Sequence, residues 1–461
     1  MTPADTLETI TDPKFRQLCE EVVIGMDRLP VIGAVVGVFH DGKEYVAGFG
    51  VTSVEHPLPV TEDTLFQIGS ITKTYTATAL MRLVEMGRLE VDAPVRAYVP
   101  ALRLSDESVA AQVTVRHLLT HTGGWVGDYF NDFGLGEDAL SRMVASLALL
   151  PQLTPLGAVW SYNNTGFYLA GRIVEAITGK SFETALKELV FDPLGLTMSF
   201  FFPHDVLTHR FAVGHEIVDR QPKVARPWAL PRSAAPAGGI ICSVGDLFRY
   251  ARFHTGDGAA PDGTRLLSPG TLALMQTPMF SASGINMIGL SWFISNVNGV
   301  KIIGHSGSTN GQVSDVRIVP ERKFAVAVLT NSSTGRTLCY DVSKSALRRY
   351  LDVTLPEPMP LELPPDTLSE YTGRYDSALA VGEVSFQDGG LALTLTFKGG
   401  FPTPDSPPPP SPPPMRIALY DEDRMIALDD PFKSERGEFL RDPDGHIAWL
   451  RVAGRVFARQ T

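Results

Sequence analysis

The sequence predicts an α+β protein in which one antiparallel sheet is built from both ends of a long region, and a small antiparallel β-barrel follows it. A hairpin pattern lies within residues 32–50, and further strand patterns return only after residue 288. Helical periodicity dominates the residues between them. A proline-rich stretch then separates this region from short alternating segments, so we expect one domain over residues 1–355 and a second over 366–461.

The early hairpin is predicted from alternating residues on either side of Asp41-Gly42, a dipeptide typical of a two-residue turn. From Thr74 onward apolar residues recur with a helical period, and Gly87 ends this pattern. Further helices are expected in the middle of the chain, at residues 114–120, 138–149, 165–178, 181–190 and 244–255.

Strands return towards the end of the first domain. Consecutive antiparallel strands are expected at 288–295, 299–305, 313–319 and 323–330, and a helix is expected around 338–351. The early hairpin and these late strands can share one sheet. Helices would flank this sheet, with an all-helical part inserted in the chain between the two groups of strands.

The second domain is expected to be a barrel of short strands, at 381–387, 391–397, 415–420, 424–428, 437–441, 446–452 and 455–458. The prolines at 401–414 favour an extended, exposed loop. The apolar residues expected in the barrel core are Phe386, Leu391, Leu393, Trp449 and Val452. A domain of this size has a modest core, so we expect it to pack against the first domain and shape substrate access without contributing a catalytic group.

Composition excludes several function classes. The net charge of −11 and the absence of a basic stripe argue against nucleic acid as a partner. No apolar run is long enough to predict a membrane span, and the acidic, polar start of the chain does not resemble a secretory signal. The three cysteines are few and widely spaced, which indicates a reducing compartment, and we expect the cytoplasm.

The first candidate site is Ser70-x-x-Lys73, where a loop enters the helix that ends near Gly87. A residue in the first helical turn has its N–H at the positive end of the helix dipole, and a lysine three residues later lies on the same face. A serine hydroxyl needs a base to become a nucleophile, and lysine can be that base only if burial lowers its pKa. On this motif alone, a helix-capping serine followed by a solvated lysine is the favoured interpretation.

Two further motifs favour the catalytic interpretation. Tyr162-x-Asn164 precedes a predicted helix, where Tyr162 can relay protons and Asn164 can bind Lys73 or substrate. The simpler alternative is a capping loop. His305-Ser306-Gly307-Ser308 follows a predicted strand and starts a glycine-rich turn. Gly307 would let substrate approach, and the N–H groups of Ser308 and Ser70 would form an oxyanion hole.

These motifs occur in the order found in the penicillin-binding-protein and class C β-lactamase superfamily, which the chain resembles over roughly residues 20–350. The stretches TVRHLLTHTGG at 114–124 and PAGGIICSVGDLFRYARF at 236–253 are also similar to stretches of that family. The region from Leu368 onward is similar to the lipocalin-like C-terminal domain of some members. The resemblance implies a β-lactamase/transpeptidase-like fold and a serine hydrolase with catalytic Ser70, Lys73, Tyr162, Asn164, His305 and Ser308.

The third motif departs from the pattern usual in β-lactamases and cell-wall peptidases, because His305 stands where they carry lysine. A neutral histidine gives no permanent charge to hold a substrate carboxylate. The resemblance therefore implies a carboxylesterase or a D-amino-acid-type peptidase or amidase, with weak β-lactamase activity at most. An acyltransferase using the same acyl-enzyme and a non-catalytic sensor of the same fold are the alternatives.

No metal or organic cofactor is implied, and the expected partner is a small ester, amide or peptide. His117 and His121 are four residues apart, a spacing that can place two metal ligands on one helix face, but no third ligand is evident and packing is favoured. Residues 125–137 are aromatic, acidic and punctuated by glycine. They fit a wall of the active-site pocket and a plain surface loop equally well.

Overall fold

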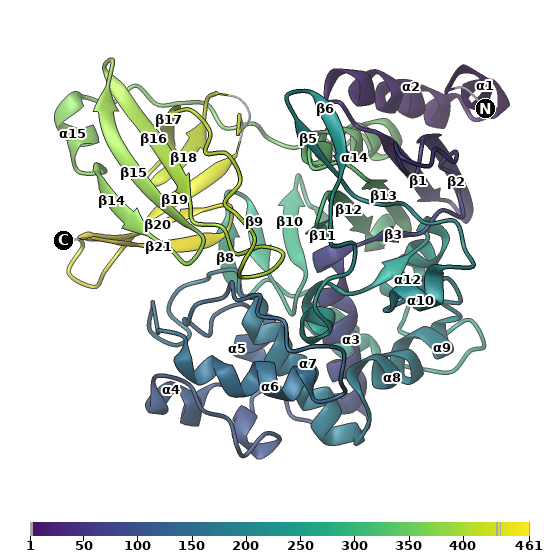
Figure 1. Ribbon diagram of the computed structural model, residues 1–461, viewed down its shortest axis with the longest axis horizontal. Helices are drawn as coiled ribbons and strands as arrows, with labels where there is room; N and C mark the ends of the chain where they lie inside the picture. Colours follow the sequence, from purple (N-terminus) through teal and green to yellow (C-terminus); the bar gives the residue numbers. More distant parts are fainter. Residues whose placement is uncertain (1–2, 430–431, 434, 461) are drawn as a thin grey trace.

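The computed structural model describes residues 3–429, 432–433 and 435–460, and Figure 1 shows their arrangement. A sheet with helices packed on it, a helical part and a C-terminal barrel can be distinguished, and the barrel stands beside the sheet and above the helical part in this view. The α+β fold class and the separate barrel predicted from the sequence are confirmed.

Both ends of the first region build the main sheet, as expected. Among the described residues it has eight strands, in the order β2 (Lys43–Gly50), β1 (Gly33–His40), β13 (Phe324–Thr330), β12 (Gln312–Val319), β11 (Val300–Thr309), β10 (Phe293–Val297), β9 (Asn286–Ile288) and β8 (Phe280–Ser283). Every pairing within it is antiparallel. Strand β1 is buried on both faces, and its alternate residues enter two separate apolar clusters.

Two predicted strand boundaries are wrong. The single strand expected at 288–295 is two strands, β9 and β10, because the chain turns between them at Ser291, whose φ is +72°. The strand expected to end at His305 continues to Thr309, so the residues predicted to form a glycine-rich turn extend β11 instead. The Asp41-Gly42 turn is confirmed, with φ values of +50° and +76°.

Helices cover the two faces of the sheet. On one face lie α2 (Pro13–Arg28) and α14 (Gly335–Leu351), whose buried residues share a cluster with alternate residues of β1. The other face carries α12 (Val244–Thr255), and α3 (Thr72–Glu85) runs from this side of the sheet into the helical part (Figure 1). The remaining helices are α1 (Pro3–Thr9), α4 (Glu107–Gln112), α5 (Val115–Leu119), α6 (Ala139–Ser146), α7 (Asn164–Thr178), α8 (Phe182–Leu186), α9 (Asp192–Leu194), α10 (Pro203–Val206), α11 (Ala235–Gly238), α13 (Pro269–Met275) and α15 (Pro365–Ser369).

Short strands complete the first region. Strands β3 (Phe66–Gln67), β7 (Ile241–Cys242) and β4 (Ser199–Phe200) form a small antiparallel sheet that leads into α3, and β5 (His215–Val218) pairs with β6 (Gln221–Val224). No helix in the part of the chain that the structure describes combines the length and apolar character that crossing a bilayer requires.

The C-terminal strands close into a barrel of eight within the described residues. They are β14 (Gly373–Asp376), β15 (Ala380–Gln387), β16 (Gly390–Phe397), β17 (Met415–Asp421), β18 (Arg424–Ala427), β19 (Arg436–Arg441), β20 (Ile447–Val452) and β21 (Arg455–Arg459). The sequence interpretation missed β14, which closes the barrel by pairing with β21. Residues 401–414 form no helix or strand.

The predicted barrel core is correct in part. Leu391, Leu393 and Val452 are buried, but Phe386 is exposed on the outside of β15. The indole N–H of Trp449 donates to the carbonyl oxygen of Leu153, so this residue docks the barrel onto the helical part. The expectation that the barrel packs against the first region is confirmed by this contact.

We predict that Gly37→Val lowers the free energy of unfolding by about 1–3 kcal/mol, because overpacking a filled core strains it. A Cβ at Gly37 would lie 2.7 Å from both the Phe248 ring and the Val244 side chain of α12. Urea unfolding checks this, with Gly390→Ala as the control, since nothing lies within 4 Å of the added carbon there. Equal stability of the two variants would contradict the close packing of β1 on α12.

Candidate active site

Ser70 lies in a short 3-10 turn, Gly69–Ile71, that runs directly into α3. The preceding Gly69 has a φ of +51°, and a Cβ there would lie 2.7 Å from the backbone nitrogen of Ser308. Glycine is therefore required at this position for conformation and for space. This close approach brings the backbone of β11 beside the loop that carries Ser70.

Lys73 is completely buried, and its amine contacts Ser70. Its Nζ lies 3.0 Å from Ser70 Oγ and donates a 2.7 Å hydrogen bond to the carbonyl oxygen of Ala237. Burial lowers the pKa of Lys73 well below its usual value, and the nearby Arg455 guanidinium lowers it further. The solvated lysine of the alternative interpretation is thereby excluded, and the lowered pKa favours the neutral form of the amine, the form that can accept a proton from Ser70.

The segment around α11 forms the wall behind Lys73. Besides the Ala237 carbonyl, the carbonyl oxygen of Pro236 accepts a hydrogen bond from the Thr76 hydroxyl, and the Ile240 N–H donates to Thr72 Oγ1. These backbone contacts hold the first turns of α3 against residues 236–240. They explain structurally why the stretch at 236–253 accompanies the Ser70 motif.

Tyr162 lies over the same amine. The Lys73 Nζ is 4.9 Å from the centre of the Tyr162 ring, and the Tyr162 hydroxyl hydrogen-bonds Ser70. Burial raises the pKa of Tyr162, while its bond to Ser70 opposes this shift. The His121 ring stacks on Tyr162 at 4.4 Å between centroids, and its Nδ1 accepts a hydrogen bond from the Asn163 N–H.

Asn164 does not bind Lys73 as one of the predicted roles required. Its amide donates to Oδ1 of Asp128 at 2.7 Å, and the structure describes no hydrogen bond between Asn164 and Lys73. Asn163 caps α7 by accepting from the Gly166 N–H. The capping part of the simpler alternative is therefore correct, and it coexists with a Tyr162 that reaches Ser70.

His305 is buried near Tyr162, with the centroids of the two rings 6.2 Å apart. Burial, with a smaller contribution from the Lys73 charge, lowers the pKa of His305 to about 3, so the ring is neutral. Its Nδ1 lies 2.6 Å from the Ser306 carbonyl oxygen. Because that oxygen only accepts, Nδ1 carries the proton and Nε2 is an acceptor, with no partner among the described residues.

The outer edge of β11 is open beside Ser70. Strand β10 pairs with β11 only as far as Gly304, whereas β12 continues its pairing on the other side to Thr309. At Gly307 a Cβ would lie 1.9 Å from the Ile68 carbonyl oxygen, so only glycine allows this approach. The exposed Ser308 next to it leaves a strand edge to which an extended substrate can bind.

The histidine pair at His117 and His121 serves packing. The His117 Nδ1 receives the Thr114 N–H in a capping box at the start of α5, and His121 supports Tyr162. Within the described ranges, no group of three histidine, cysteine, aspartate or glutamate side chains is placed to hold a metal ion.

Two site residues escaped the sequence interpretation, Asp128 and Arg455. Asp128 lies in the 125–137 segment, for which the sequence predicts a pocket wall or a surface loop, and its side chain is 4% exposed. Arg455 comes from β21 of the barrel, with its Nε 3.1 Å from Asp128 Oδ2 and its guanidinium carbon 4.6 Å from the Tyr162 ring centre. No sequence motif marks Arg455, because it lies 327 positions after Asp128 in the chain and the two residues meet only in the fold.

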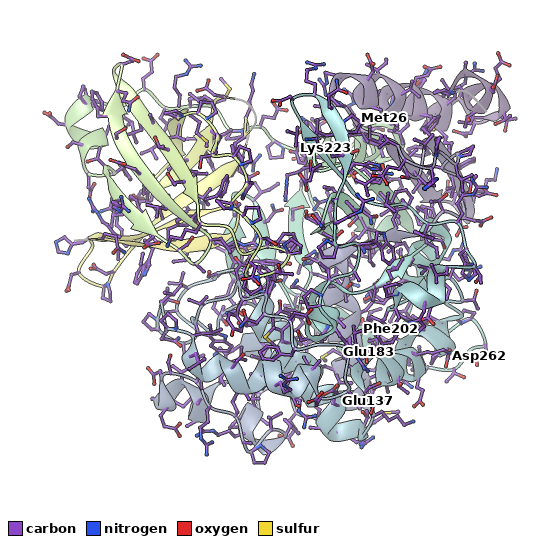
Figure 2. The ribbon with its side chains drawn as sticks, in the orientation of Figure 1. Met26, Glu137, Glu183, Phe202, Lys223 and Asp262 are labelled. Carbon is purple, nitrogen blue, oxygen red and sulfur yellow. The ribbon has the colours of Figure 1, made fainter. Side chains whose placement is uncertain are left out.

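The 125–137 segment contacts both the barrel and the helical part. Phe130 meets Phe401 of the barrel edge to face, with centroids 5.0 Å apart. Further along, the Leu135 carbonyl oxygen accepts from Arg232, which also pairs with Glu183 at 2.9 Å and lies over the Phe202 ring. Figure 2 labels Glu183 and Phe202 close together, with Glu137 below them in this view. The segment therefore fits the wall interpretation.

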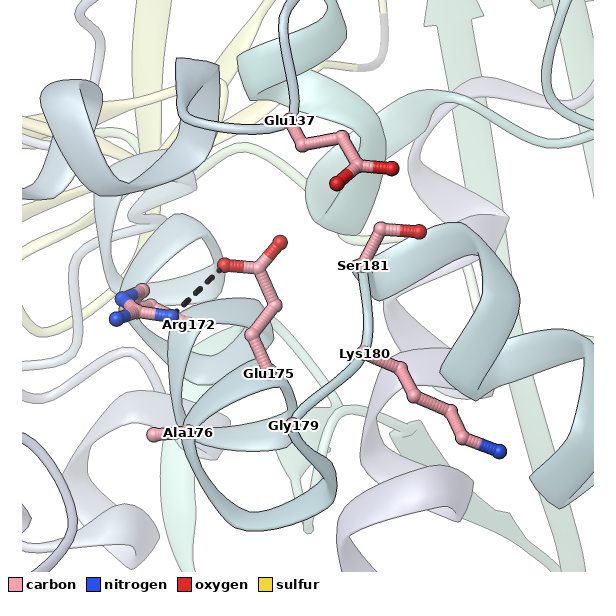
Figure 3. A pocket seen from close by; sticks show the side chains of 7 residues that line it. All are labelled: Glu137, Arg172, Glu175, Ala176, Gly179, Lys180 and Ser181. Carbon is pink, nitrogen blue, oxygen red and sulfur yellow. Dashed lines mark hydrogen bonds and ion pairs between the residues drawn. The ribbon is translucent and has the colours of Figure 1, made fainter.

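A separate hollow of about 390 Å³ lies at the other end of α7 (Figure 3). Its polar groups already have partners, since Glu175 pairs with Arg172 at 3.1 Å and Ser181 caps α8. Glu175 is eleven residues along α7 from Asn164, which corresponds to roughly 16 Å of helix. The hollow shares no lining residue with the Ser70 site and is distinct from it.

The comparisons with known proteins agree with this fold. The beta-lactamase family model matches residues 22–344, and the chain belongs to this family. Penicillin-binding protein 4 of Amycolatopsis lactamdurans is 38% identical over 358 residues, which are 75% of this chain and 93% of that protein. Esterase EstB of Burkholderia gladioli is 34% identical over 212 residues, 42% of this chain and 53% of that protein.

The crystal structure of SurE resembles the whole chain, with a TM-score of 0.76 and 28% identity, covering 97% of this chain and 99% of SurE. The match therefore includes the barrel as well as the first region. Together the relatives place the protein among serine hydrolases of β-lactamase, esterase and penicillin-binding-protein type.

The buried amine yields a prediction about stability. Between the lowered pKa of folded Lys73 and its ordinary value near 10.4, the unfolded chain binds the extra proton, so wild-type stability should rise with pH in that window. Lys73→Met lacks this contribution. We expect the unfolding free energy of Lys73→Met relative to wild type to be highest at neutral pH and to decrease towards pH 10 in urea titrations. A difference that is constant between pH 7 and 10 would mean that Lys73 titrates normally.

Proposed function

We propose that the protein hydrolyses small esters, amides or peptides through an acyl-enzyme on Ser70. The observation that carries this proposal is the 3.0 Å contact between Ser70 Oγ and the completely buried Lys73 amine. A serine beside a solvated, charged lysine would gain nothing from it, whereas a neutral amine is a base of useful strength.

In the proposed reaction Lys73 accepts the Ser70 proton as Oγ attacks the substrate carbonyl carbon. The N–H groups of Ser70 and Ser308 stabilise the resulting oxyanion, a role supported by the close approach of the two backbones at Gly69. Tyr162 passes the proton to the leaving alcohol or amine as the carbonyl re-forms. Water then attacks the acyl-enzyme, its proton returns through the same groups, and the acid leaves with Ser70 regenerated.

His305 and Asn164 have supporting roles in this proposal. The neutral His305 presents Nε2 as a hydrogen-bond acceptor behind Tyr162, and it supplies no fixed positive charge. Asn164 orients Asp128 at the pocket wall. This charge distribution favours substrates without an essential carboxylate, such as simple esters.

The relatives support ester, amide and D-amino-acid peptide substrates as classes. One similar protein is named an esterase, and SurE, 28% identical to this chain, has been solved with D-Leu. The open edge of β11 suits an extended peptide. If an amine reaches the acyl-enzyme before water does, the same site acts as an acyltransferase. The three cysteines are free and buried, which supports the cytoplasm as the working compartment.

Ser70→Ala should abolish labelling by a β-lactone or phosphonate probe while the melting temperature stays close to that of wild type. Intact-mass measurement and peptide mapping check this, and Ser181→Ala in the separate hollow should label normally.

Lys73→Ala and Tyr162→Phe should each slow acylation by about 10²- to 10⁴-fold, and their combination should cost little more, because the groups act together. A label on any residue other than Ser70 would refute the proposal.

Short-chain aryl esters should be better substrates than cephalosporins. A carboxylate held by a charged group typically gains about 1.5–3 kcal/mol, so without that charge at His305 cephalosporins lose about a ten- to hundredfold advantage in kcat/KM, and esters should have the higher kcat/KM. Spectrophotometric assays of both substrate classes on the same preparation measure the ratio. A kcat/KM for a cephalosporin above that for the esters would contradict the role given to His305.

A further inference from the structure

The barrel reaches the active site through one hairpin, β20–β21. The Tyr162 N–H donates to the Gly454 carbonyl oxygen at 2.8 Å, and the Val456 N–H donates to Ser161 Oγ at 3.2 Å. Arg451 donates to the Trp160 carbonyl oxygen at 3.0 Å. Three consecutive residues that end at Tyr162 are therefore held by the barrel, in addition to their contacts with His121.

The turn of this hairpin fits its position closely. Gly454 has a φ of +76°, and a Cβ there would lie 2.9 Å from the Trp160 ring. A residue with a side chain would strain the turn and push the hairpin away from Trp160. The packing of the hairpin turn on Trp160 therefore requires glycine at position 454.

Arg455 follows this glycine and joins two parts of the site. Its guanidinium lies over the Tyr162 ring, and it pairs with Asp128, whose other hydrogen bond goes to Asn164 at the start of α7. The Asp128 side chain is 4% exposed and that of Arg455 is 37% exposed, so removing Arg455 would leave a buried carboxylate without its charged partner.

We propose that Arg455 is a positioning residue for the reaction at Ser70, and that its contacts with Asp128 and Tyr162 make the barrel hairpin part of the working active site. This inference rests on the proposed acyl-enzyme function. Arg455 acts through Tyr162 and Lys73, and it forms no bond to the reacting atoms.

The charges around Lys73 agree with this role. The groups that face the amine are Arg455, Asp128, Tyr162, His121 and His305. Burial keeps both histidines neutral by lowering their pKa values, so Arg455 and Asp128 are the charged members of this group. Arg455 lowers the pKa of Lys73, whereas Asp128 raises it. The positive charges of Arg455 and Arg336 both oppose the rise in the pKa of Tyr162.

The test measures the single-turnover acylation rate of the full-length protein with a p-nitrophenyl ester between pH 5 and 10. In Arg455→Met the positive charge is lost and Asp128 is left unpaired, and both changes favour protonated Lys73. The acidic limb of the pH–rate profile, on which the rate falls as Lys73 becomes protonated, should therefore move to higher pH by about one unit. At a given pH on that limb the acylation rate then falls about tenfold. Arg455→Lys keeps the charge but not the planar guanidinium, so the acidic limb of this variant should lie close to that of the wild type.

A second variant separates position from charge. Asp128→Asn combined with Arg455→Met removes both charges, so the acid limb should return towards the wild-type position while the rate stays low, because Tyr162 and Asn164 have lost their anchor. Arg416→Met, on the barrel surface with 72% of its side chain exposed, is the matched control and should behave as wild type.

Two outcomes would overturn the inference. In the first, Arg455→Met acylates at the wild-type rate with an unchanged acid limb. In the second, all Arg455 variants lose rate and melting temperature together without any displacement of the limb, so that Arg455 only docks the barrel. A wild-type protein that forms no acyl-enzyme would refute the proposed function and this inference with it, whereas normal acylation of Arg455→Met refutes the inference alone.

Discussion

The buried amine of Lys73 constrains everything that surrounds Ser70. Its hydrogen bonds to Ser70 Oγ and the Ala237 carbonyl oxygen hold it inside the protein, where a charged amine is poorly solvated. Burial therefore lowers the pKa of this amine and favours its neutral form, which can act as a base. The main sheet, the start of α3 and the segment around α11 must then pack tightly enough to keep water from the amine, which explains the close backbone approaches at Gly69 and Gly307.

Tyr162 joins the catalytic region to the barrel. Its hydroxyl meets Ser70, its ring is stacked on His121, and its backbone N–H is bound by Gly454 of the barrel hairpin. The side chain is therefore positioned from two regions that lie almost 300 residues apart in the chain. The barrel, expected to shape only substrate access, supports the proton-relay residue of the proposed mechanism.

The sequence led to the correct fold class because hydrophobic periodicity is local. The Asp41-Gly42 turn, the helix after Ser70 and most barrel strands follow from residues within one element. The errors fall where tertiary contacts override the pattern. Residues 288–295 are apolar enough for one strand, yet the chain turns at Ser291, and β11 runs on to Thr309 because β12 pairs with it there. Phe386 is apolar but lies on the outer face of the barrel.

The sequence by itself determined which residues could do the chemistry, because Ser70 and Lys73 are three residues apart on one helix and Tyr162 and His305 lie in short motifs. Only the tertiary structure decided how their charges are set. The pKa values of Lys73 and His305 depend on burial, and burial is a property of the packed molecule. The pairing of Arg455 with Asp128 belongs to the same level, since a contact across 327 residues leaves no local spacing for a motif to record.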